Sequence, residues 1–207
     1  MRGLLVVDVQ NDFCQGGALE VKQAEEIIPV VNELIDRFTD RGEVVVATMD
    51  WHPADHGSFA SNSGGKVGEM GDLCGISQIW WPDHCVQNTH GAELHPELRF
   101  VQDKIHKGTN SKVDSYSGFY SASREETDLD QFLKERKVDT LYVVGLATDY
   151  CVKFTVMDAL KLGYKVYLVA DGCRGVNLSP SDSDDAIREM REGGAVIVSS
   201  RDIVLDQ

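Results

Sequence analysis

The sequence predicts a three-layer α/β fold, in which a mostly parallel, six-stranded sheet lies between layers of helices. Short, uninterrupted apolar runs recur along the chain, which is typical of strands buried on both faces of a parallel sheet. Segments with the spacing of amphipathic helices separate these runs. At 207 residues the chain is long enough to bury a substantial core, and we expect residues 1–207 to form a single domain.

Five of the apolar runs are rich in β-branched residues and are predicted strands. They are GLLVV (3–7), VVVATM (44–49), LYVVGL (141–146), VYLVA (166–170) and AVIV (195–198). A sixth run, FVQDKI at 100–105, is more polar than the others. Its polarity predicts a strand that lies nearer an edge of the sheet.

The predicted helices lie between these strands. Residues 27–38 place their apolar side chains on one helical face, with Pro29 in the first turn and Gly42 beyond the end. Three further helices are predicted around 128–136, over 152–160 and over 179–191. In the last of them, Ser179 is the expected cap and Pro180 the first-turn residue.

Residues 51–99 interrupt the alternation of strands and helices. This region holds all three tryptophans and five of the six histidines, and its apolar residues show little periodicity. A loop region this long inside a compact domain usually has a function. We therefore expect part of a functional site to come from it.

Charge and cysteine content exclude several classes of protein. The net charge is −14 and the pI is near 4.7, so the surface should repel nucleic-acid phosphates and anionic lipid. The N-terminus MRGLLVVDVQ has too short an apolar run for a secretory signal or a membrane span. Five cysteines without CxxC spacing are expected to be reduced thiols, and the predicted location is the cytoplasm.

Polar side chains follow four of the predicted strands. Asp8 ends the first strand, Asp50 and His52 follow the second, Lys107 follows the polar run, and Cys151 begins the helix after the strand at 141–146. Ligands of open α/β sheets bind beyond the carboxyl ends of the strands. We therefore expect these five residues to converge in space.

Cys151 has the surroundings expected of a nucleophile. A free thiol has a pKa of about 8.5, and a position at a helix N-terminus favours the thiolate. A lysine ammonium at roughly 4 Å would contribute at most about 4 kcal/mol at an effective dielectric of 20, enough to make the thiolate the main form. A carboxylate such as Asp8 could accept the thiol proton and deliver it to a leaving amine. The alternatives are a small buried apolar Cys151, an Asp8 that caps a loop and a solvated Lys107.

Asp50 and His52 form a DxH motif whose side chains point the same way in extended backbone. His84, from the same irregular region, is a third candidate ligand for a divalent metal, and His56 is either a fourth ligand or a neighbour of the ligands. One carboxylate and two imidazoles suit Zn²⁺, Fe²⁺ or Mn²⁺ and leave coordination positions open. A DxH motif alone is weak evidence. A structural zinc site that includes Cys74 and Cys85 is disfavoured by their spacing.

Three aromatic residues, Phe13, Trp81 and Tyr116, lie beside the candidate polar groups in the sequence. They could line a flat apolar pocket for a ring, although ordinary core packing is the alternative for each of them. The chain has neither a GxGxxG nor a GxxxxGK[ST] motif, which disfavours a nucleotide-binding protein.

Five segments in order carry a resemblance to a known family. They are LLVVDVQNDFCQGGAL, ATMDWHPADHGSFAS, WWPDHCVQNTHGAELHP, KGTNSKVDSYSGF and GLATDYCVKFTVMDAL. Together they closely resemble nicotinamidases of the isochorismatase-like cysteine hydrolase superfamily. The match runs nearly from end to end, and it implies the isochorismatase-like hydrolase fold.

The resemblance assigns a role to each candidate residue. It implies a catalytic triad of Asp8, Lys107 and Cys151 and a set of metal ligands formed by Asp50, His52 and His84. It also implies a cis peptide bond before Ala147, followed by an oxyanion hole formed by the amides of Ala147 and Cys151. The implied walls around a pyridine ring are Phe13, Trp81 and Tyr116. The implied reaction converts nicotinamide to nicotinate and ammonia through a thioester, in NAD salvage. The implied cofactor is one divalent ion, with zinc as the first choice and iron or manganese as alternatives.

Two other functions stay open from the sequence. One is a related amidase acting on another small carboxamide, such as a carbamoyl or ureido compound, although such relatives generally lack the metal set. The other is a non-enzymatic metal- or ligand-binding α/β module. Isochorismatases proper lack the cysteine. The sequence leaves open the metal, the role of His56, activity on pyrazinamide and whether the protein forms a homo-oligomer.

Overall fold

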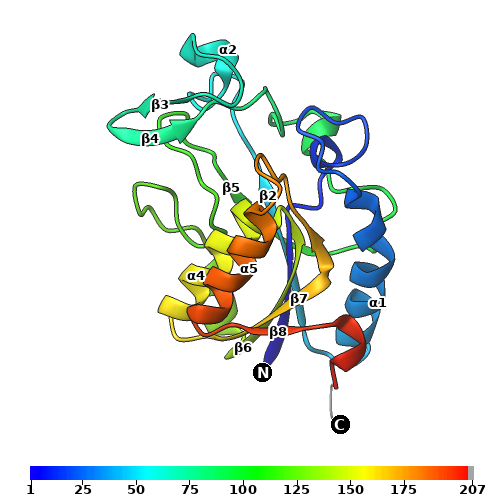
Figure 1. Ribbon diagram of the computed structural model, residues 1–207. Helices are drawn as coiled ribbons and strands as arrows, with labels where there is room; N and C mark the ends of the chain where they lie inside the picture. Colours follow the sequence, from blue (N-terminus) through cyan, green and yellow to red (C-terminus); the bar gives the residue numbers. More distant parts are fainter. Residues whose placement is uncertain (205–207) are drawn as a thin grey trace.

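The computed structural model of the protein describes residues 1–204. Its main sheet has six strands in the order β5-β2-β1-β6-β7-β8, and every neighbouring pair is parallel (Figure 1). The strands are β1 (Arg2–Val7), β2 (Val44–Asp50), β5 (Asp103–Lys107), β6 (Thr140–Leu146), β7 (Lys165–Arg174) and β8 (Val196–Val198). The predicted six-stranded, parallel α/β fold is confirmed.

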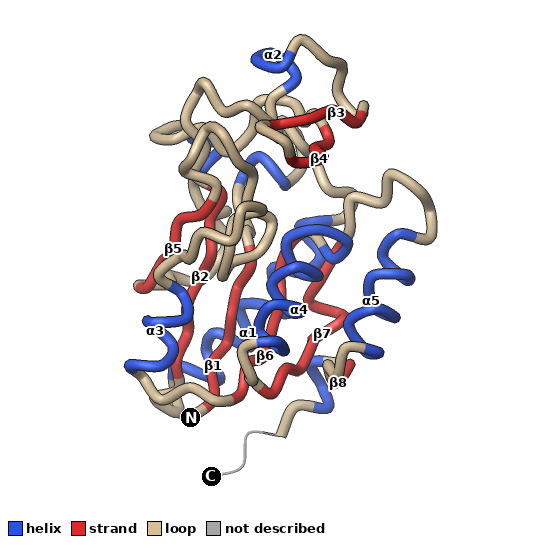
Figure 2. The backbone as a smooth tube through the Cα atoms, turned by 90° about the vertical axis from the view of Figure 1, so that its left-hand side faces the viewer, coloured by secondary structure: helices blue, strands red, loops and turns tan. Residues whose placement is uncertain are grey.

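Helices cover both faces of the sheet. Helix α1 (Ile28–Thr39) lies on one face, and α3 (Leu129–Glu135), α4 (Lys153–Lys161) and α5 (Asp182–Glu192) lie on the other (Figures 1 and 2). Strand β1 shows why its run is uninterrupted: Leu4 packs in the core under α1, whereas Leu5 packs in the core under α4 and α5. Successive side chains of a strand point to opposite faces, so both sets must be apolar.

The two edge strands differ from the prediction in detail. Strand β5 lies at an edge, as its polarity predicted, but begins at Asp103 and ends on Lys107 itself. Strand β8 lies at the opposite edge, and Val196 is 43% exposed. It was predicted as a strand buried on both faces, which is wrong because an edge strand has a neighbour on one side only.

The predicted helices are present, with one corrected boundary. Helix α5 begins at Asp182 rather than near Ser179. The Asp182 carboxylate accepts the N–H of Ser179 at 2.7 Å, so Ser179 and Pro180 form a turn before the helix. Pro29 does lie in the first turn of α1.

Residues 51–99 are mostly irregular, as expected, but they include short elements that the sequence did not predict. These are α2 (Ala60–Ser63) and an antiparallel hairpin of β3 (Met70–Leu73) and β4 (Ile76–Ile79). The hairpin lies beyond the carboxyl ends of the main strands (Figure 2). Within residues 1–204, no helix has both the length and the apolar character needed to cross a membrane.

Candidate active site

The carboxyl ends of four adjacent strands bring charged side chains together. Asp8 follows β1, Asp50 ends β2, Lys107 ends β5 and Cys151 follows β6. Asp50 and Lys107 are register partners in neighbouring strands. Asp8 has a φ of 49°, a left-handed conformation that aspartate tolerates better than most residues, and this turn ends β1. All four side chains are buried.

Lys107 is the centre of this group. Its Nζ donates to the Cys151 sulfur at 3.3 Å and to the Ser115 carbonyl at 2.9 Å, and lies 2.9 Å from Asp8 Oδ2. It also forms an ion pair with Asp50. Burial opposes the charge on Lys107, but the Asp50 and Asp8 carboxylates hold the pKa of this ammonium well above its usual range. Lys107 is therefore a buried, permanently charged cation with two carboxylate partners.

Cys151 lies in a π-helical turn, Thr148–Val152, that leads into α4. The preceding peptide bond between Leu146 and Ala147 is cis, as the resemblance implies. The ligand atoms of Asp8, Asp50 and Cys151 lie within 4.8 Å of one another. Two carboxylates thus lie beside the sulfur.

The electrostatic balance at the sulfur differs from the sequence-based expectation of a thiolate. Burial raises the pKa of the Cys151 thiol, Lys107 lowers it, and Asp8 and Asp50 raise it further, so that it lies well above the usual range. The expected anionic sulfur is therefore corrected to a neutral thiol. One ammonium cannot outweigh burial and two converging carboxylates. For this sulfur to act as a nucleophile, a base must therefore take its proton.

Asp8 is the group placed to accept that proton. It is fully buried and hydrogen-bonded to Thr48 at 2.7 Å. Burial raises the pKa of Asp8, Lys107 lowers it and Asp50 raises it again, with a net shift above the usual range. A raised pKa makes this carboxylate a stronger base than an exposed aspartate, which suits proton transfer from a thiol.

Asp50, His52 and His84 converge on one point beside the group around Lys107. The Nε2 atoms of His52 and His84 lie 3.6 and 3.8 Å from Asp50 Oδ2, and all three residues are buried. The Nδ1 of His52 lies 2.8 Å from the Gly108 carbonyl, and the Nδ1 of His84 lies 2.7 Å from the Pro82 carbonyl.

These carbonyl contacts fix the state of both histidine rings. A carbonyl can only accept a hydrogen bond, so each Nδ1 carries a proton, and each ring in its neutral form presents the lone pair of Nε2. Gly108 is needed for this arrangement, because it has a φ of 63° and a Cβ there would lie 2.4 Å from Cε1 of His52. The trio is therefore preorganised to bind a divalent cation.

His56 and Asp114 lie next to this trio. Their ligand atoms and that of His52 lie within 4.8 Å of one another. His56 Nε2 has no hydrogen-bond partner in the described part of the chain, and burial together with His52 lowers the pKa of His56 to about 4. Sequence reasoning missed Asp114, a buried carboxylate within a polar loop whose pattern carries no periodic signal. It accepts a hydrogen bond from Gln78 at 3.0 Å.

The three aromatic candidates line one narrow pocket together with Cys151 and Ala147. The indole N–H of Trp81 donates to the hydroxyl of Tyr116 at 2.9 Å, and the ring centroid of Phe13 lies 5.6 Å from that of His84. The pocket therefore has Cys151 and the candidate metal ligand His84 among its lining residues, together with the three aromatic side chains.

Besides Asp114, three further side chains line the pocket and were not predicted. They are Leu19, Tyr150 and Val176. Tyr150 packs edge-on against Trp81, with ring centroids 5.1 Å apart, and its position next to Cys151 in the sequence was an available signal. Leu19 and Val176 are ordinary apolar residues of loops, and no local pattern distinguishes them.

Comparison with known proteins matches residues 2–202 to the isochorismatase domain. The chain is 53% identical to a nicotinamidase of Escherichia coli over 204 residues, which cover 97% of this chain and 96% of that protein. A solved nicotinamidase and pyrazinamidase of Acinetobacter baumanii superposes with a TM-score of 0.92 at 45% identity, covering 98% of each chain. A pyrazinamidase of Pyrococcus horikoshii, solved in complex with zinc, gives a TM-score of 0.81 at 42% identity, covering 96% of this chain and 98% of the other.

Proposed function

Because the chain belongs to the isochorismatase family, we propose that it is a nicotinamidase that hydrolyses nicotinamide to nicotinate and ammonia in NAD salvage. The observation that carries the proposal is the buried triad: Lys107 Nζ lies 3.3 Å from the Cys151 sulfur and 2.9 Å from Asp8. Cys151 lines a pocket with aromatic walls. The relatives that match this chain over nearly its whole length, two of which are described as nicotinamidases, support the same conclusion.

The first half of the reaction uses the neutral thiol. Asp8 takes the proton of Cys151 as the sulfur attacks the carboxamide carbon, and Lys107 balances the negative charge that moves between the two. The backbone N–H groups of Ala147 and Cys151 stabilise the oxyanion, each by about 3 kcal/mol if other oxyanion holes are a guide. Asp8 then returns the proton to the leaving nitrogen, and ammonia departs to leave a thioester on Cys151.

The second half of the reaction regenerates the thiol. Asp8, ionised again, takes a proton from a water molecule that attacks the thioester carbonyl. The same two amides hold the second oxyanion. The carbon–sulfur bond breaks, nicotinate is released and the sulfur recovers its proton from Asp8. Each residue of the triad ends in the state in which it began.

The residues Asp50, His52 and His84 fit a divalent cation, since both imidazole lone pairs and one carboxylate oxygen face the same point. We assign zinc as the first choice, with iron or manganese as alternatives. When bound, such an ion supplies positive charge and open coordination positions for the ring nitrogen of the substrate. Phe13, Trp81 and Tyr116 hold the flat ring, and the triad performs the proton transfers.

The test is release of ammonia by the purified protein, compared among nicotinamide, pyrazinamide and an N-carbamoyl amino acid. We expect nicotinamide to give the highest kcat/KM of the carboxamide and carbamoyl compounds. Cys151→Ala should lose nearly all activity, whereas Cys173→Ala, which removes a buried thiol on β7 away from the pocket, should keep it. Release of ammonia from nicotinamide at equal rates by Cys151→Ala and the parent would exclude the proposal. Preference for the carbamoyl compound would favour the related amidase.

A further inference from the structure

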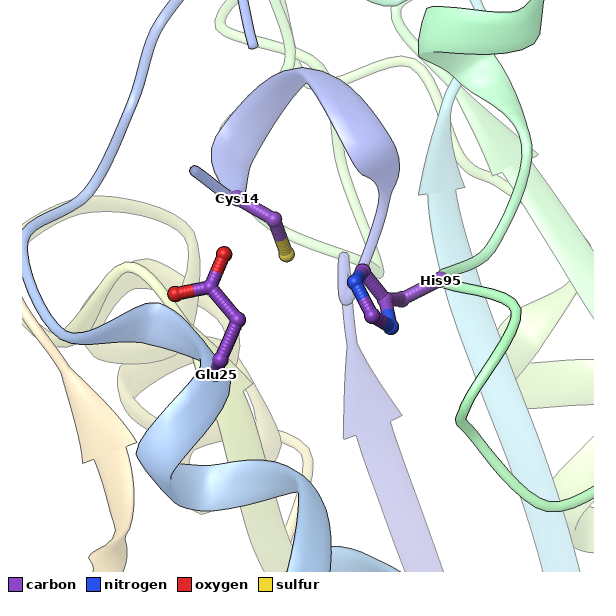
Figure 3. A group of neighbouring side chains, drawn as sticks. All are labelled: Cys14, Glu25 and His95. Carbon is purple, nitrogen blue, oxygen red and sulfur yellow. The ribbon is translucent and has the colours of Figure 1, made fainter. Parts of the chain in front are cut away.

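A second group of metal-ligating side chains lies outside the candidate active site. Cys14 follows the short 3-10 turn Asn11–Phe13, Glu25 lies in the turn Ala24–Ile27, and His95 lies in the loop after the turn His90–Ala92. Figure 3 shows the three side chains pointing toward one another from three separate segments. One ligand atom from each lies within 4.8 Å of the other two.

Each of the three side chains has a ligand atom available. Cys14 is 2% exposed, and its sulfur makes no hydrogen bond with any residue between 1 and 204 that would hold its lone pairs. One carboxylate oxygen of Glu25 accepts the N–H of Gln15, which leaves the other oxygen. The Nδ1 of His95 accepts the Glu97 N–H at 3.3 Å, so Nε2 carries the proton of the neutral ring and becomes a ligand atom once that proton moves to Nδ1.

The charges of this group balance those of a divalent cation. Burial, and then the negative charge of Glu25, raise the pKa of the Cys14 thiol to about 12. A cation between the sulfur and the carboxylate reverses this effect, because it attracts both. One thiolate, one carboxylate and one neutral imidazole together carry two negative charges, so a divalent ion would make the site neutral.

We propose that Cys14, Glu25 and His95 bind a divalent cation of the zinc type, at a site that shares no residue with Asp50, His52 and His84. A thiolate, an imidazole and a carboxylate are all ligands of zinc, and a water molecule completes four-coordination. Binding releases the thiol proton to solvent. The neutral His95 ring moves its proton from Nε2 to Nδ1, and the weak contact from the Glu97 amide is lost.

The position of this site gives it a role in holding the pocket wall. Cys14 directly follows Phe13, which lines the substrate pocket. An ion bound to Cys14, Glu25 and His95 would join the segment that carries Phe13 to two other segments. It would thereby restrict the movement of that wall without contacting the substrate.

Titration of the metal-free protein with Co²⁺ tests the proposal. Cobalt bound to a thiolate gives a near-ultraviolet charge-transfer band, whereas a carboxylate–imidazole site does not. The titration is made in a Cys151→Ala background, so that the sulfur of the active site contributes nothing. We expect a charge-transfer band in this protein and its displacement by Zn²⁺.

Matched variants locate the band. Cys14→Ser should abolish it and remove one equivalent of bound Co²⁺, and Glu25→Gln, which keeps the side-chain shape, should weaken Co²⁺ binding at least tenfold. Cys74→Ser, which removes the exposed thiol, should leave the band unchanged. A band that survives Cys14→Ser, or no band at all, overturns the proposal. His84→Ala should remove the equivalent of Co²⁺ that binds at the candidate active site, without changing the band. The band therefore reports on the Cys14 site alone, and its outcome does not depend on whether the protein releases ammonia from nicotinamide.

Discussion

The two ends of the main sheet treat charge in opposite ways. At the amino ends, charged groups form pairs near the surface: the N-terminal ammonium lies 3.1 Å from an exposed Asp139, and Arg2 lies 2.7 Å from Glu43. At the carboxyl ends, Lys107 and its carboxylate partners are buried. Surface pairs contribute about 0–1 kcal/mol, whereas burying charges costs several kcal/mol per ion before pairing offsets it. The difference teaches that the carboxyl end is organised for chemistry rather than for stability.

The sharpest test of this comparison removes the buried cation. Lys107→Met leaves two buried carboxylates without their shared partner, so we expect unfolding free energy to fall by about 3–5 kcal/mol. Activity should fall by about 10³-fold, since the charge that balances the moving proton is lost. Urea denaturation and the ammonia assay measure the two effects.

Lys104→Met is the matched control for this change. Lys104 lies on the same strand, β5, but its side chain is exposed. It should change stability by less than about 0.5 kcal/mol and leave activity intact. Equal effects of the two substitutions would show that the buried charge has no special role.

The second test removes a candidate metal ligand at the carboxyl end. His84→Ala should raise KM for nicotinamide by at least about tenfold, by analogy with the loss caused by disturbing metal sites, with a smaller fall in kcat. In the proposed mechanism the ion would hold the ring, whereas the triad would perform proton transfer. Treatment with a chelator should reproduce the effect in the parent protein. His90→Ala, which changes an exposed histidine, is the control, and a fall in kcat at unchanged KM would contradict the division of labour.

The pH dependence of kcat/KM tests the buried ion pair of Asp8 and Lys107 directly. Asp8 must be ionised to accept the thiol proton, and its pKa is raised above 3.8. As pH falls through this raised pKa, Asp8 gains a proton, so activity should decline at a higher pH than for an ordinary aspartate, by about tenfold per pH unit. The pKa of Lys107 is raised well above 10.5, so its ammonium should cause no loss near pH 9. Circular dichroism at each pH distinguishes loss of activity by protonation of Asp8 from loss by acid unfolding. A fall in kcat/KM centred below pH 3.8 would rule out Asp8 as the base.

The smallest effect is expected at the amino end of the sheet. Glu43 accepts hydrogen bonds from the backbone N–H and the Nε of Arg2, at 2.9 and 2.7 Å. Glu43→Gln should lower the unfolding free energy by about 1 kcal/mol and leave kcat/KM unchanged. Urea denaturation measures the first quantity. A tenfold loss of activity would show that the amino end of the sheet also affects catalysis, against this expectation.

Local patterns predicted most of the fold and failed where an element buries little apolar surface or where burial depends on partners distant in the sequence. The apolar run at 3–7 predicted β1 because both faces of this strand are buried, so that its side chains are apolar on both faces. The hairpin of β3 and β4 was missed because its strands have no buried apolar residue and few β-branched residues; the one buried side chain, that of Gln78, is polar. Asp114 was missed for a different reason, since it lies against Gln78, His52 and His56, which are distant from it in the chain.

The sequence by itself determined the parallel α/β architecture, the acidic surface and the set of side chains that follow the strands. It could do so because periodicity and composition are local properties. Only the tertiary structure decided the protonation state of Cys151, because that state depends on how many carboxylates and ammonium groups converge on the sulfur. The same is true of the meeting of Cys14, Glu25 and His95, which come from three segments whose proximity exists only in the folded chain.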